Sequence, residues 1–138
     1  MKEDIAGRAK TILELVGKIE ERSPETVAEY QQKLLARLTE MLHDSNIEEQ
    51  RLLTEAAIFA DKVAVAEETV RLRSHFAQLE TMLESEEPVG RKLDFLVQEM
   101  NREANTIGSK AVDSQIAYMV VDIKAEIEKI REQIQNIE

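Results

Sequence analysis

Apolar residues recur at helical spacing along almost the whole chain. In the segment 88–110 they follow i, i+3, i+4, i+7 spacing, which places them on one stripe of a core-facing helix. That stripe consists of Leu93, Leu96, Val97, Met100, Ala104 and Ile107. Stripes of the same kind predict helices over residues 3–22, 24–43, 47–63 and 67–85, and a last helix after residue 108. The pattern predicts an all-α fold of about six helices, arranged as a multi-helix bundle or an extended helical array.

Short polar segments separate these predicted helices. Ser23 followed by Pro24 predicts a helix end and a new start, because Ser favours the N-cap and Pro the first helical position. Asn46 with Glu49 three residues later resembles a capping box, and His43 just before it suits a helix C-terminus. The run SEEPVG (85–90) predicts a turn into the central helix.

The last predicted helix carries a heptad-like isoleucine seam. Its members alternate in steps of four and three: Ile116, Val120, Ile123, Ile127, Ile130, Ile134 and Ile137. In a free coiled coil, β-branched residues at both core positions favour oligomers larger than a dimer. The helix over 3–22 has the same spacing and could fill the seam within one chain, so the sequence leaves both interpretations open.

Composition narrows the class of protein. At 138 residues, with 43% hydrophobic and 33% charged residues, the chain is predicted to form a single helical domain, 1–138. It has no cysteine, which excludes a disulfide framework, a thiol nucleophile and a cysteine zinc site. There is no signal-peptide core and no apolar run of about 18 residues, so we expect a cytoplasmic location. P-loop, dinucleotide-binding, GxSxG and HExxH motifs do not occur.

Charge is distributed unevenly along the chain. The net charge is −10, but residues 88–110 hold four cationic against three acidic side chains, so this segment is +1 and the remaining 115 residues are −11. The side of this helix away from the stripe carries Arg91, Phe95, Gln98, Arg102 and Asn105. Guanidinium and amide groups beside an exposed aromatic ring suit a ligand with phosphates and flat bases. A buried polar interface with another helix is an equal alternative.

Carboxylates and one histidine form a second candidate site. Glu55, Glu68, His75, Glu99 and Glu103 come from three predicted helices and could converge on one cation. Oxygen-rich ligands with one nitrogen suit Mg²⁺ or Mn²⁺ better than zinc. His75 is also a candidate general acid or base, but its position taken alone favours a boundary residue that hydrogen-bonds a neighbouring carboxylate.

Three segments carry a resemblance to a known family. RLRSHF (71–76), PVGRKLDFLVQEMNREANTIGSKA (88–111) and KAEIEKIREQIQNIE (124–138) resemble the C-terminal half of the YicC/YloC family of bacterial stress-induced proteins. The resemblance implies a divalent-metal-dependent endoribonuclease that assembles as a homo-hexamer around RNA. Family members are about twice this length, so the chain is expected to be a C-terminal half that lacks an N-terminal domain.

The chemistry of the matching positions then gives a predicted site. The catalytic candidates are His75, Glu99 and Glu103, and the metal ligands would be Glu55, Glu68, Glu99 and Glu103. The predicted RNA contacts are Arg71, Arg91, Lys92, Phe95, Gln98, Asn101, Arg102, Asn105 and Lys110. Two other functions stay open: a non-catalytic oligomerisation and RNA-binding adaptor domain, and a structural bundle whose polar helix contacts the missing domain.

Overall fold

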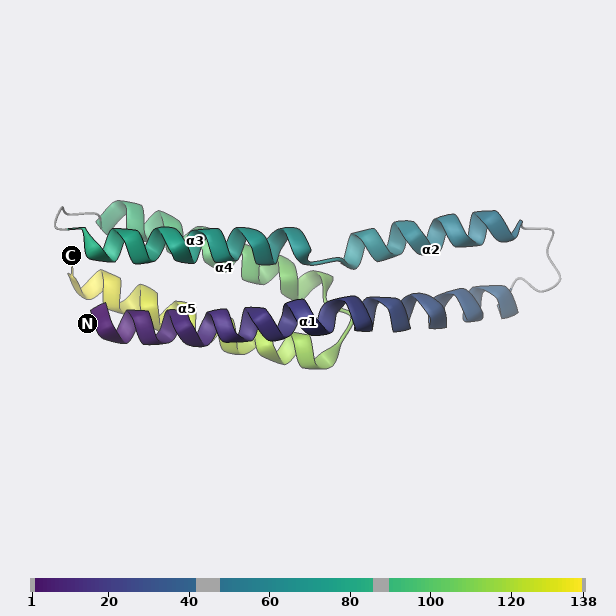
Figure 1. Cartoon of the computed structure of the whole chain (residues 1–138), viewed down its shortest axis with the longest axis horizontal. Helices are drawn as coiled ribbons and strands as arrows, with labels where there is room; N and C mark the ends of the chain where they lie inside the picture. The colour runs from purple at the N-terminus through teal and green to yellow at the C-terminus, as the bar shows by residue number, and fades with distance from the viewer. Residues whose placement is uncertain (1, 42–47, 86–89, 138) are drawn as a thin grey trace.

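The computed structural model describes residues 2–41, 48–85 and 90–137, and within these ranges the chain is all α-helical (Figure 1). It contains five helices and no strand there: α1 Lys2–Met41, α2 Glu49–Val63, α3 Ala66–Glu84, α4 Gly90–Lys110 and α5 Ser114–Ile137. The predicted fold class is confirmed, whereas the predicted number of about six helices is wrong. The capping residues proposed at His43 and Asn46, and most of the turn before α4, lie outside the described residues.

The miscount arises at Pro24, which lies inside α1 instead of starting a new helix. A proline in a helix interior removes one backbone hydrogen bond and costs about 3 kcal/mol in isolation. The helix continues because it is packed on both sides of the proline, first against α3 and α5 and then against α2. Thr26 is buried, and its hydroxyl donates to the Ser23 carbonyl at 3.0 Å. Tertiary packing here outweighs the local preference of Ser23 and Pro24 for a helix start.

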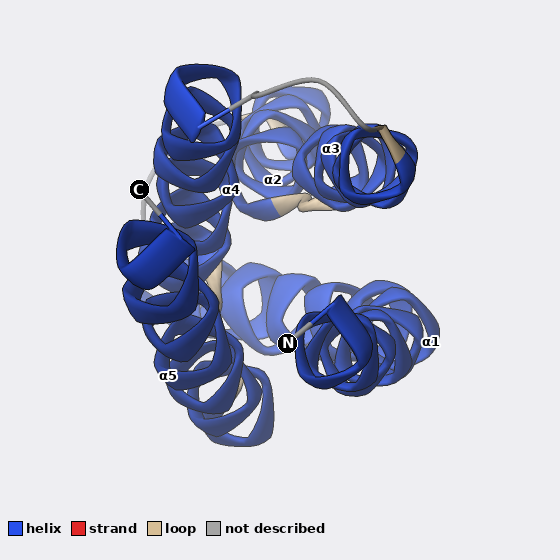
Figure 2. Ribbon diagram, turned by 90° about the vertical axis from the view of Figure 1, so that its left-hand side faces the viewer, coloured by secondary structure: helices blue, strands red, loops and turns tan. Residues whose placement is uncertain are grey.

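The first half of α1 forms a four-helix bundle with α3, α4 and α5 (Figure 2). The isoleucine seam of α5 lies inside this bundle, where Ile123, Ile130 and Ile134 are fully buried. It packs against α4 and against α1, whose own stripe is equally buried: Ile5, Ala9, Ile12, Val16 and Ile19. The seam is therefore filled within one chain, as the matching spacing of the first helix allowed. The Ile137 side chain lies outside the description.

The connection from α4 to α5 differs from the predicted one. Helix α4 continues through Gly108, where an added Cβ would lie 3.1 Å from Cγ1 of Val120, so glycine permits the close approach of α5. Asp113 caps α5, because its Oδ2 accepts a hydrogen bond from the Ile116 backbone N–H at 3.1 Å. The same carboxylate binds Arg22 of α1 at 2.6 Å and so joins the start of α5 to α1.

A two-helix extension, which we call the arm, projects beyond the bundle. The arm consists of residues 24–41 of α1 and of α2, and it lies at the end of the molecule opposite to both termini (Figure 1). Here α1 and α2 contact each other, while α4 and α5 cover only the bundle. Ala56 is the one buried apolar residue among the described residues of the arm. None of the described helices combines the length and apolarity needed to cross a membrane.

Candidate functional site

Two buried carboxylates face each other across α3 and α4. Glu68 on α3 is 2% exposed and Glu103 on α4 is 7% exposed, so each needs a partner to offset its desolvation. Lys110 Nζ lies 2.6 Å from Glu68 Oε1, and Arg71 Nε donates to Glu103 Oε1 at 2.9 Å. Arg71 also lies 3.6 Å from Glu68. The four side chains form one neutral network, which we call the carboxylate network.

The helix geometry explains how the network forms. Glu68 occupies a core position of α3, between Val65 and Leu72, and Glu103 lies beside the buried stripe of α4. Because α3 and α4 pack side by side, a core position on one helix comes within reach of a cation on the other. The hydrogen bond to Glu103 raises the pKa of Arg71 further above its usual range, which keeps this guanidinium charged.

Two buried polar atoms on α3 have no hydrogen-bond partner among the residues that the structure describes. They are Oε2 of Glu68 and Nδ1 of His75, a half-buried residue that follows Arg71 by one helical turn. On α4, Glu99 precedes Glu103 by one turn, and its closest cation is Arg102 at 3.7 Å. An unpaired buried oxygen or nitrogen costs free energy unless a ligand, proton or water satisfies it. Of these two atoms, only Oε2 of Glu68 belongs to the carboxylate network, and it is buried there without a partner among the described residues.

The predicted five-residue metal site does not assemble. Glu68 and Glu103 come together, but through Arg71 and Lys110, which occupy oxygens that a cation would need. Glu55 is exposed on α2, and α2 packs against the far half of α1. Across the described ranges, no three carboxylate or histidine side chains lie close enough to hold a metal ion. The described donor set therefore does not form a ready-made divalent-metal site.

A polar surface runs along the outside of α4, and we call it the α4 outer face. Arg91, Lys92 and Phe95 lie at its beginning, with Phe95 at 63% exposure. Further along α4, one shallow surface hollow is lined by Gln98, Asn101, Arg102, Asn105, Thr106 and Ser109. Four of the predicted RNA contacts, Gln98, Asn101, Arg102 and Asn105, thus line the same hollow.

The side chains of the α4 outer face differ in whether they already form hydrogen bonds or ion pairs within the protein. Arg91 and Lys92 form no ion pair with any described residue, and the amides of Gln98, Asn101 and Asn105 form no hydrogen bond in the described part of the chain. Thr106 and Ser109 donate to carbonyls of their own helix. The free donors and acceptors are therefore Arg91, Lys92 and the three amides, whereas Arg102 lies 3.7 Å from Glu99. Guanidinium, ammonium and amide groups are those that contact phosphates, sugars and base edges.

Two predicted RNA contacts have structural partners instead. Lys110 binds Glu68 and the Ala64 carbonyl, and Arg71 binds Glu103 and Glu68. Sequence reasoning placed both cations with the exposed ones because their partners lie 42 and 32 residues away. It also missed Thr106 and Ser109, although their spacing of four from Arg102 and Asn105 places them on the same side of α4.

Comparison with known proteins places the chain in a family. The family described as "Endoribonuclease YicC-like, C-terminal" matches residues 19–138. A protein of Clostridioides difficile (strain 630) named "Probable endoribonuclease YicC" is 51% identical over 137 residues, which are 99% of this chain and 47% of that protein. A protein of the same name from Haemophilus influenzae is 37% identical over 134 residues, which are 97% of this chain and 46% of that protein.

The chain thus spans about half the length of the curated relatives that it matches. The segments that carry the resemblance, 71–76, 88–111 and 124–138, all lie within the matched range. These segments contain Arg71, Glu103 and Lys110 of the carboxylate network, whereas Glu68 lies three residues before the first segment. They also contain the whole α4 outer face. This chain belongs to the YicC-like endoribonuclease family and corresponds to its C-terminal domain.

Proposed function

We propose that this domain binds RNA on the α4 outer face and serves an endoribonuclease that cleaves RNA phosphodiester bonds. The observation that carries the proposal is that Arg91, Lys92 and the amides of the α4 outer face have no partner among the described residues, on a surface that also holds the exposed ring of Phe95 and in a chain of net charge −10. In such a chain, cations left without partners are favoured sites for an anionic ligand. The names of the relatives supply the substrate class.

In this proposal the residues of the α4 outer face have separate roles. Arg91, Lys92 and Arg102 contact phosphates, and the ring of Phe95 stacks on a base. Gln98, Asn101 and Asn105 hydrogen-bond sugar hydroxyls or base edges. Recognition of this kind suits single-stranded or locally opened RNA, because its bases are free to leave the stack and lie against a protein surface.

The chemical step is proposed to use His75 with Glu99 and Glu103. Nδ1 of His75 is buried without a hydrogen-bond partner among the described residues, so an imidazole nitrogen is left for proton transfer with a substrate hydroxyl or water that reaches it. Dependence on Mg²⁺ or Mn²⁺ is the part of the proposal that the resemblance contributes. The described donors would have to release Arg71 or Lys110 from the carboxylates to hold such an ion.

A second candidate function is a non-catalytic RNA-binding and oligomerisation domain. It is favoured by the carboxylate network, in which each buried carboxylate is paired to a cation as in a structural ion pair. In that case the catalytic residues would belong to the half of the relatives that this chain does not span. Both candidates predict RNA binding on the α4 outer face, and they differ only in whether this domain contributes to cleavage.

RNA affinity tests the shared part of the proposal. Fluorescence anisotropy with a labelled single-stranded RNA would compare the parent chain with Arg91→Ala and Arg102→Ala over a series of salt concentrations. Each lost phosphate contact should lower the log–log salt slope by about 0.7. Lys10→Ala is the matched control, since Lys10 is an exposed cation of α1 without an ion pair to any described residue. Equal effects of all three substitutions would contradict a specific site on α4.

A further inference from the structure

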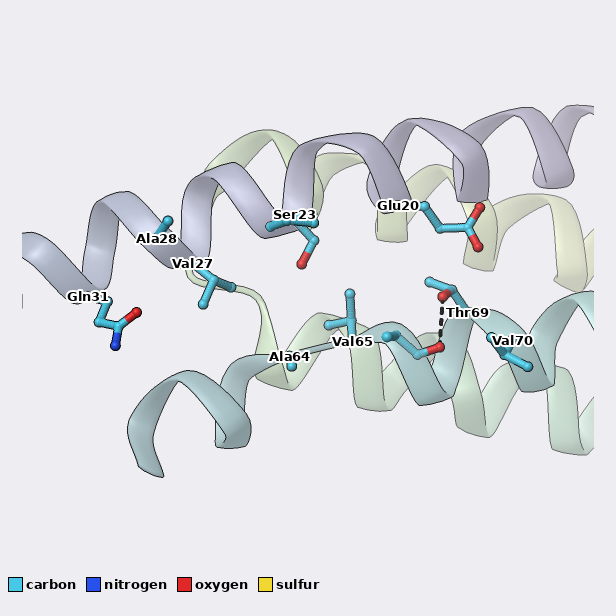
Figure 3. A pocket seen from close by; sticks show the side chains of 11 residues that line it. Glu20, Ser23, Val27, Ala28, Gln31, Ala64, Val65, Thr69 and Val70 are labelled. Atoms are coloured by element: carbon cyan, nitrogen blue, oxygen red, sulfur yellow. Dashed lines mark hydrogen bonds between the residues drawn. The ribbon is translucent and has the colours of Figure 1, made fainter. Parts of the chain in front are cut away.

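A pocket of about 490 Å³ opens at the base of the arm, between α1 and the segment that joins α2 to α3 (Figure 3). No described residue of α4 or α5 lines it. Its walls are mostly apolar, and they are formed by Pro24, Val27, Ala28, Ala64, Val65, Ala66 and Val70. A volume of this size is within the range of pockets that bind small molecules.

The pocket arises because one helix ends while the helix opposite continues. Helix α2 ends at Val63 and α3 begins at Ala66, and Ala64 between them has an extended backbone with φ −71° and ψ 136°. Helix α1 runs past this break without interruption. Three short side chains meet there, those of Ala28, Ala64 and Ala66, so the space between α1 and the break stays unfilled. Val70 at its edge is 64% exposed.

A buried hydroxyl without a partner points into this pocket. Ser23 is 7% exposed, and its side chain extends from α1 toward Val65 (Figure 3). The Ser23 carbonyl accepts a hydrogen bond from Thr26, but the Ser23 hydroxyl forms none with any described residue. A buried hydroxyl has lost its hydrogen bonds to bulk water, so it favours a ligand that restores one. Ser23 therefore provides a polar contact within an otherwise apolar wall.

The remaining polar groups determine which charge a ligand can carry. Glu20 is the one charged side chain among the described lining residues. Both of its carboxylate oxygens accept hydrogen bonds from Nε of Arg73, at 3.0 and 3.1 Å, and this pairing lowers the pKa of Glu20. An anionic ligand would lie near this carboxylate without a cation of its own among the described lining residues. At the opposite end of the pocket, Gln31 offers a neutral amide that bonds no described residue (Figure 3).

The backbone at the break is less available than these side chains. The Ala64 carbonyl accepts a hydrogen bond from Lys110 at 3.3 Å, and the Ala66 carbonyl accepts one from Thr69 at 3.0 Å. An extended peptide segment binds through a row of free backbone groups. A small molecule needs only apolar contact and one or two polar groups. The pocket therefore favours a free small molecule over a peptide.

We infer that this pocket binds an uncharged, mostly apolar small molecule that carries a hydroxyl, carbonyl or N–H group. The apolar body lies against Val27, Val65 and Val70, and the polar group exchanges a hydrogen bond with the Ser23 hydroxyl. The bound molecule contacts α1, the break and the start of α3 together, so it stabilises the junction between the arm and the bundle. The inference goes beyond RNA binding, because no residue of the α4 outer face lines this pocket.

Titration with 2-naphthol tests the inference, because this probe is uncharged, mostly apolar and carries one hydroxyl. The chain has no tryptophan, so the fluorescence of the probe can be followed without tryptophan emission from the protein. We expect saturable binding with a dissociation constant on the order of 1 mM or lower. The sulfonate with the same rings, 2-naphthalenesulfonate, should bind at least about tenfold more weakly, because its negative charge has no partner in the pocket.

Substitutions in α1 locate the binding site. Ala28→Phe should fill the pocket and abolish saturable binding. Ala6→Phe is the matched control, since Ala6 is an exposed alanine near the start of the same helix, and it should bind the probe like the parent. Ser23→Ala should weaken 2-naphthol binding by about threefold to tenfold, because it removes the hydrogen-bonding group. Saturating 2-naphthol should raise the Tm of the parent and of Ala6→Phe, but not that of Ala28→Phe.

Circular dichroism should show the same helicity for all variants, and Ser23→Ala decides alone if Ala28→Phe does not fold. Several results would overturn the inference: no saturable binding of 2-naphthol by the parent, equal binding by Ala28→Phe and Ala6→Phe, unchanged affinity in Ser23→Ala, or equally tight binding of the sulfonate. RNA affinity of the same chains is measured separately, so RNA binding and binding in this pocket can fail independently.

Discussion

Removing the positive charge of Lys110 separates a structural role from a role in RNA binding. In the structure Lys110 Nζ lies 2.6 Å from a carboxylate of Glu68 that is 2% exposed, and it also contacts the Ala64 carbonyl at 3.3 Å. Lys110→Met keeps most of the side-chain volume and stem packing but removes the charge. It would leave the Glu68 carboxylate buried with Arg71 at 3.6 Å as its remaining cation.

The expected loss can be estimated from this geometry. Breaking a buried ion pair by removing one partner costs about 3–5 kcal/mol. The lower end applies here, because Arg71 still compensates part of the charge and the Lys110 side chain is 29% exposed. We expect the free energy of unfolding to fall by about 3 kcal/mol and Tm to fall by about 10 °C for a chain of this length.

A double-mutant cycle gives the assay its control. Urea unfolding followed by circular dichroism would compare Lys110→Met, Glu68→Gln and the double variant. Since Glu68→Gln removes the charge that Lys110 neutralises, the double variant should be more stable than the sum of the two single effects by about 1–3 kcal/mol. Lys92→Met, on the same helix but exposed and without a described ion pair, should leave stability unchanged and lower the salt slope of RNA binding.

The opposite pattern would refute this account. If Lys110→Met changed the free energy of unfolding by less than about 0.5 kcal/mol, the ion pair with Glu68 would contribute nothing measurable. If it also lowered the RNA salt slope as Lys92→Met does, Lys110 would be a phosphate contact, as the sequence suggested. The carboxylate network would then have to be regarded as part of the RNA site.

Three further results are expected. Ile127→Asp should unfold the chain, because it places a carboxylate at a seam position that is 2% exposed. Burial of that charge costs several kcal/mol, so a folded variant by circular dichroism would contradict the intramolecular seam. The hydrogen bond from Arg22 lowers the pKa of Asp113 below its usual 3.8, so this pair stabilises the fold above that pH and stops doing so as pH falls through the lower folded pKa. Asp113→Asn should cost about 1 kcal/mol in urea unfolding at pH 7, and a cost that stayed the same well below the usual aspartate pKa would exclude the pair as its cause. In an RNA-cleaving protein that carries this domain, as proposed above, Glu99→Gln and Glu103→Gln should each abolish RNA cleavage without weakening RNA affinity, and EDTA should abolish cleavage too. Parent-rate cleavage by both variants would exclude these carboxylates, and cleavage in EDTA would exclude the metal.

The sequence predicted what depends on periodicity. Every member of the apolar stripe of α4, from Leu93 to Ile107, is buried, because a 3.6-residue repeat determines which side of a helix faces the core whatever packs against it. The seam of α5 was found for the same reason. The phase of a repeat is a local property, and it survives without any knowledge of the partner helix.

What the sequence did not predict depends on contacts between distant residues. The break expected at Pro24 is absent because packing on both sides of it maintains α1 as one helix. Glu103 was predicted as a catalytic residue and metal ligand, but it is 7% exposed and its Oε1 accepts a hydrogen bond from Arg71 of α3, 32 residues away. Helix propensity and the position of a residue around its helix depend only on residues nearby in the sequence. A carboxylate with a distant partner and one without a partner therefore cannot be told apart from the sequence.

The cations of this domain divide into two groups by their partners, and the division bears on function. Arg71 and Lys110 neutralise carboxylates that the core would otherwise hold unpaired, so their charge is already used within the fold. Arg91 and Lys92 have no described ion pair and lie on the α4 outer face. A phosphate that displaced Arg71 or Lys110 would leave a buried carboxylate next to the negative charge of the phosphate. A phosphate that bound Arg91 or Lys92 would break no described ion pair. RNA should therefore approach this domain at the beginning of α4, and its binding there should leave the carboxylate network closed.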